Sequence, residues 1–91
     1  MYGLVIARHG DGDIIKISST EEKLHQIVFA EIKQYLSKNK KIPKDEEFRL
    51  LLDSMQTSDA ELAMEIIGNI AEKNNKPLFM AITKAEIVID A

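Results

Sequence analysis

Residues 1–17 read MYGLVIARHGDGDIIKI: an apolar stretch, a segment rich in glycine and aspartate, and a second apolar stretch. The residues from Leu4 to Ala7 are all apolar, and segment 14–17 is apolar except for Lys16. Glycine and aspartate between two such stretches supply the positive-φ positions that a tight turn needs. This segment therefore predicts an N-terminal β-hairpin.

The other end of the chain is also strand-like. The run from Leu78 to Ile82 is continuously apolar, and Ile87 to Ile89 follows after Thr83-Lys84-Ala85. Lys84-Ala85 is unfavourable in a tight turn, so we expect either two strands or one long bent strand here. Because a strand cannot leave its N–H and C=O groups unpaired, the two ends of the chain should pair with each other or with another chain.

Three helices are predicted between these ends, from Ser19 to Asn74. Two begin with a capping-box pattern, at Ser19 and at Ser58, and the middle one begins with the acidic segment 45–47. Each has apolar residues spaced three and four apart, which would form one buried stripe. The stripes are Leu24, Ile27, Val28, Ile32, Tyr35 and Leu36; Phe48, Leu51, Leu52 and Met55; and Leu62, Ala63, Met64, Ile66, Ile67, Ile70 and Ala71.

The predicted fold class is α+β. We expect the N-terminal β-hairpin and the C-terminal strand or strands to form one mainly antiparallel sheet, with three central helices packed on it (ββαααββ), and residues 1–91 to form a single domain. The chain has no cysteine, which suits a reducing compartment, and no 18-residue apolar run. We therefore expect a cytoplasmic protein that neither spans a membrane nor carries a secretory signal. The net charge of −3 argues against nucleic-acid binding.

The strands have more apolar surface than three helices can cover. Side chains alternate between the faces of a sheet, so a continuously apolar strand indicates that both faces are buried. Four strands about 4.8 Å apart make a sheet about 19 Å wide, and two helices of about 10 Å diameter would cover one face. Either the helices divide two and one, with the twist of the sheet hiding the rest, or a second chain covers the remaining surface.

Several residues are candidates for contact with a partner protein. Gly68 lies on the polar side of the third helix, in line with three glutamates, where a gap in an acidic stripe would let a basic partner approach closely. The alternative is a solvated face with an incidental glycine. Two further apolar residues lie off their helix stripes, and two polar residues lie at the hairpin tip. The candidate partner-binding residues are Glu61, Glu65, Gly68, Glu72, Phe29, Leu50, Arg8 and His9.

Arg8-His9-Gly10, directly after an apolar strand, resembles the signature of histidine phosphatases. In that family the histidine accepts the phosphoryl group and the arginine binds it. The match covers these three residues and the strand alone, whereas such enzymes have a far larger α/β domain and a second catalytic histidine. We therefore do not assign the chain to this family.

Two other groups of charged residues could have a function, but a structural role explains each of them better. His9, Asp11 and Asp13 are possible ligands of a divalent cation, but Asp-Gly pairs are explained by turn geometry alone. No glutamate completes a calcium-loop pattern. The lysines of segment 38–44 are explained by the negative end of the first helix dipole. We expect no catalytic residue, no metal and no cofactor.

These patterns predict a small non-enzymatic protein-binding module or inhibitor, with another protein or a second copy of itself as partner. The chain has 10 lysines, 2 arginines and 13 isoleucines, a usage typical of an AT-rich genome. An accessory protein of a phage or virus that acts on a host protein fits this usage. The alternatives are a small phosphate- or metal-binding enzyme that uses the Arg8–Asp13 tip, and a homodimeric regulator that binds RNA weakly through the lysines.

Overall fold

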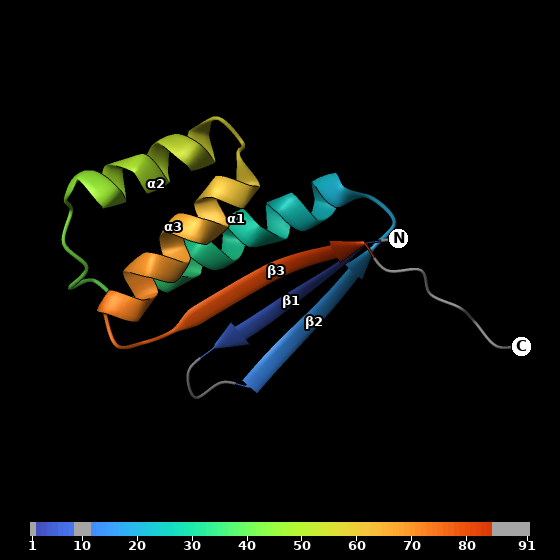
Figure 1. The fold of residues 1–91 in the computed structure, drawn as a ribbon, viewed down its shortest axis with the longest axis horizontal. Coiled ribbons are helices and arrows are strands. Elements are labelled where there is room, and N and C mark those ends of the chain that lie inside the picture. The colour runs from blue at the N-terminus through green and yellow to red at the C-terminus, as the bar shows by residue number, and fades with distance from the viewer. Residues whose placement is uncertain (1, 9–11, 85–91) are drawn as a thin grey trace, which may run out of the picture.

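The predicted α+β architecture is confirmed. The computed structural model describes residues 2–8 and 12–84 (Figure 1). The elements in chain order are β1 (Tyr2–Arg8), β2 (Gly12–Ser18), α1 (Glu21–Lys38), α2 (Glu46–Gln56), α3 (Ala60–Lys73) and β3 (Leu78–Lys84). The expected strand at 87–89, and with it the choice between one and two C-terminal strands, lies outside the described residues, as does hairpin tip 9–11.

The three strands form one antiparallel sheet in the order β2-β1-β3, so the two ends of the chain pair with each other as expected. Val5 pairs with Ile15 on one side and Ala81 on the other, and Leu4 pairs with Lys16 and Ile82. Alternation along β1 separates Leu4 and Ile6, which are fully buried, from Val5, which is half-buried. The face of Leu4 and Ile6 is therefore the one that the helices cover.

The helices pack on one face of the sheet in two tiers. α1 lies against β1 and β2, and α3 lies against β3, whereas α2 packs mainly on α3 and stands away from the strands (Figure 1). α3 thus contacts the sheet on one side and α2 on another, which explains why it is the most apolar of the three helices. No described helix has both the length and the hydropathy that crossing a bilayer requires. The main core side chains are Leu4, Ile6, Leu24, Val28, Ile32, Leu51, Ile67, Ile70 and Met80.

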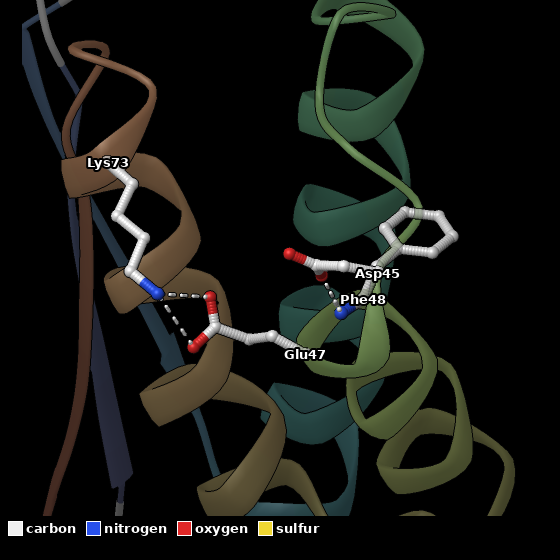
Figure 2. Close-up of polar contacts among 4 residues, drawn as sticks. All are labelled: Asp45, Glu47, Phe48 and Lys73. Atoms are coloured by element: carbon white, nitrogen blue, oxygen red, sulfur yellow. Dashed lines mark hydrogen bonds and ion pairs between the residues drawn. The ribbon is translucent and has the colours of Figure 1, made fainter.

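The helix starts only partly follow the sequence prediction. The Asp45 carboxylate accepts a hydrogen bond from the backbone N–H of Phe48 at 3.1 Å, so the acidic start of α2 is confirmed (Figure 2). The two capping boxes are wrong. Thr20 occupies the N-cap of α1 without a side-chain hydrogen bond. Asp59, not Ser58, caps α3, and its carboxylate accepts a hydrogen bond from the backbone N–H of Leu62 at 3.2 Å.

Two predicted core positions are also wrong. Leu52 and Leu62 are 45% and 43% exposed, and the buried position on α2 that the apolar pattern missed is Ser54. Its hydroxyl donates to the carbonyl of Leu51 at 2.7 Å, so a polar side chain is tolerated inside the helix pair. Leu52 faces outward because α2 packs mainly on α3. Leu62 lies in the first turn of α3 and is not among the buried residues of that helix.

Two polar contacts tie distant segments together. The Tyr35 hydroxyl donates to the carbonyl of Lys76 at 2.7 Å, which fixes the end of α1 to the connection before β3. Lys73 Nζ donates to both carboxylate oxygens of Glu47, at 3.2 and 3.4 Å, and joins α3 to α2 (Figure 2). Lys73 is 72% exposed, so water screens this pair and we expect it to contribute less than about 1 kcal/mol.

Candidate functional site

The face of the sheet opposite the helices is open to water. By register and alternation, nine described residues belong to it: Gly3, Val5, Ala7, Asp13, Ile15, Ile17, Phe79, Ala81 and Thr83. We call this set the open face. Its one charged residue among those described is Asp13, which pairs with Ala7 near the end of the sheet where β2 begins. On the opposite face of β1, Leu4 and Ile6 are fully buried. Of the two arrangements that the sequence left open, the one in which the helices divide two and one across the sheet does not hold for the described residues, because α2 packs on α3 instead.

The exposed apolar area on the open face is large for a chain of this size. Ile15, Ile17 and Phe79 are 66%, 59% and 63% exposed. Taking about 150–250 Å² for a large apolar side chain, these three leave roughly 350 Å² in water. Contiguous apolar patches of about 300–600 Å² are the largest found on typical monomers and often have a function.

A groove runs along β3 where α3 lies beside it. It has a volume of about 340 Å³. We call it the β3 groove, and it is lined by Glu61, Met64, Glu65, Gly68, Leu78, Phe79 and Met80. Phe79 belongs to both the groove and the open face, so the two surfaces are continuous around the edge of β3.

Gly68 marks the point where α3 approaches the strand. A Cβ atom built at this position would lie 3.9 Å from the carbonyl oxygen of Leu78, which is an ordinary van der Waals distance. The glycine is therefore not required by a clash with β3. Gly68 lines the groove without contributing a side chain to it.

The structure brings together three of the predicted partner-binding residues and separates the others. Glu61, Glu65 and Gly68 line the β3 groove, whereas Glu72 is exposed nearer the end of α3 and does not line it. Phe29 is half-buried and packs against the core, so it offers little surface to a partner. Leu50 is 51% exposed on α2. Arg8 lies in β1, and His9 lies outside the described residues.

Within residues 2–8 and 12–84, no group of three or more histidine, aspartate or glutamate side chains is placed to hold a metal ion. His25 Nε2 lies 3.5 Å from a carboxylate oxygen of Glu21, one turn earlier on α1, without hydrogen-bond geometry. The lysines of segment 38–44 are exposed around the α1–α2 connection.

Sequence reasoning missed Ile15, Ile17 and Phe79 as individual surface residues. The signal was present, because unbroken apolar runs in both terminal strands predicted that two faces needed cover. Periodicity could not say which residues of each run would be left outside, since that depends on the strand register and on the face that the helices choose.

Comparison of the chain with known proteins identifies no relative. No protein-family model matches the chain, and neither a curated protein nor a solved structure shows significant similarity to it.

Proposed function

We propose that this chain is a non-enzymatic protein-binding module that docks onto another protein through its open face. The observation that supports the proposal is the uncharged apolar surface of Ile15, Ile17 and Phe79 on a sheet whose helices all lie on the other side. Covering roughly 350 Å² of such surface would contribute on the order of 9 kcal/mol before the costs of association. Few other features of a domain this small offer a comparable gain.

The composition supports a narrower form of the proposal. A small acidic chain with AT-rich codon usage suits a phage or viral accessory protein that inhibits a host protein. The lack of cysteine suits the reducing cytoplasm as its place of action. A second copy of the chain is the other partner that this function admits, and it gives a homodimer.

The test compares the wild-type chain with an open-face variant. Tagged wild-type protein, Ile15→Thr/Phe79→Thr and the control Leu52→Ser are used as baits in a lysate of the source cells or their host. Threonine keeps the strand preference of a β-branched residue while removing apolar area. Leu52 is exposed on α2, far in the fold from the open face.

We expect the wild type and the control to retain the same protein and the open-face variant to lose it. Light scattering after size-exclusion chromatography shows whether a second copy is that partner. Equal capture by all three baits, or a monomeric wild type that captures nothing, contradicts the proposal.

A further inference from the structure

β3 is an outer strand of the described sheet, and residues 78–83 within it lack the charges and proline that usually protect such an edge. It pairs with β1 on one side, and no other described strand lies beyond it (Figure 1). Natural edge strands are commonly protected by charged residues or proline. β2, the other outer strand, contains Asp13 and Lys16 within its length, whereas the charged residue of β3, Lys84, is its last residue and the nearest proline, Pro77, lies just before its first.

The chemistry of the β3 groove favours one kind of segment at this edge. α3 and β3 run in opposite directions side by side (Figure 1). The wall of the groove is apolar at Met64, Leu78 and Met80, and the exposed carboxylates of Glu61 and Glu65 lie along its helical side. Among the residues that the structure describes, no basic side chain lines it. A chain in the groove would therefore meet apolar contacts and negative charge together.

We propose that the outer edge of β3 binds an extended segment of a partner protein by β-strand addition, and that this segment alternates apolar and basic residues. In an added strand, successive side chains point to opposite faces. One set would extend the open face beside Phe79, where apolar residues fit. The other set would enter the β3 groove, where lysine or arginine reaches Glu61 and Glu65. This inference rests on the proposed function and names the partner's chemistry.

A second copy of the chain fits this surface less well. Pairing two β3 edges around a two-fold axis would place both α3 helices on the same side of one sheet, with Glu61 and Glu65 of each copy facing those of the other. Like charges so placed repel, whereas a basic segment is attracted.

The probe is a phage-displayed library of random dodecapeptides, selected on the whole wild-type chain. We expect the selected peptides to alternate apolar and basic residues. The best one is synthesised and titrated by fluorescence anisotropy, and its contacts are mapped by amide chemical shifts. The shifts should concentrate on residues 78–83 of β3 and on residues 61–68 of α3.

Two pairs of variants test the groove. Glu61→Gln/Glu65→Gln should weaken the selected peptide on the order of tenfold at low salt, since each exposed ion pair contributes modestly. Glu72→Gln, on the same helix but outside the groove, should leave the affinity unchanged. Gly68→Met fills the groove and should weaken binding by about tenfold or more, whereas Asn69→Met, one residue further on the exposed side, should not. Urea unfolding confirms that each variant is folded.

Several outcomes would overturn the inference. These are selected peptides without basic residues, equal affinity for a backbone N-methylated peptide that cannot pair with β3, shifts that map to α2, or a dimer in solution that Phe79→Thr dissociates. If the lysate partner still depends on the open face while no peptide of this pattern binds, the inference fails and the proposed function stands.

Discussion

At the scale of single residues, Asp45 is the clearest case of a side chain whose chemistry sets local structure. Its carboxylate accepts from the N–H of Phe48 at the positive end of α2 (Figure 2). We expect Asp45→Ala to lower the free energy of unfolding by about 1 kcal/mol, the usual cost of a lost N-cap. Urea denaturation measures it. Thr20→Ala is the control, because Thr20 caps α1 without a side-chain bond; an equal loss in both variants would contradict the assignment.

Gly68 gives a prediction of the opposite sign. Its φ and its distance of 3.9 Å from the Leu78 carbonyl permit a Cβ atom, and glycine within a helix carries an entropic cost. Gly68→Ala should therefore stabilise the fold by about 0.5–1 kcal/mol. Thermal denaturation should show a higher Tm, at about 4–8 °C per kcal/mol for a domain of this size. A lower Tm would mean that α3 and β3 need the closer approach that only glycine allows.

At the scale of elements, Leu51 is the fully buried apolar side chain of α2, and the partly buried Phe48 and Met55 pack against the same core. Leu51 has no exposed surface, whereas its neighbour Leu52 is 45% exposed. We expect Leu51→Ala to cost about 2–5 kcal/mol, the range for a buried leucine that leaves a cavity. Leu52→Ala should cost less than about 1 kcal/mol. Chemical denaturation of the pair measures the difference, and similar losses at both positions would show that α2 turns a different face to α3.

At the scale of the whole molecule, the residues that stabilise the fold and the residues of the proposed binding surface lie on opposite faces of the sheet. Ile15, Ile17 and Phe79 each lie mainly in water, so replacing all three by threonine should change the free energy of unfolding by less than about 1 kcal/mol in total. The same variant should show less concentration-dependent light scattering than the wild type. A loss of more than about 2 kcal/mol would instead show that these side chains stabilise the monomer.

Local features followed from the sequence. The hairpin, the three helices and the acidic start at Asp45 were predicted, because each depends on residues a few positions apart. The capping boxes at Ser19 and Ser58 failed although the sequence pattern is present, because the N-cap of each helix is the residue after the serine. The acidic line through Glu61, Glu65 and Gly68 was visible as a helix face, but not as the wall of a groove.

The sequence by itself determined the kind of elements, their order and the surplus of apolar strand surface, since the spacing of apolar residues reports how each element is buried along its own axis. Only the tertiary structure decided that β1 is central, that α2 packs on α3, and that Ile15, Ile17 and Phe79 remain outside. These depend on which faces of distant segments meet. That choice is made by the packing of all six elements together, and no stretch of the chain encodes it alone.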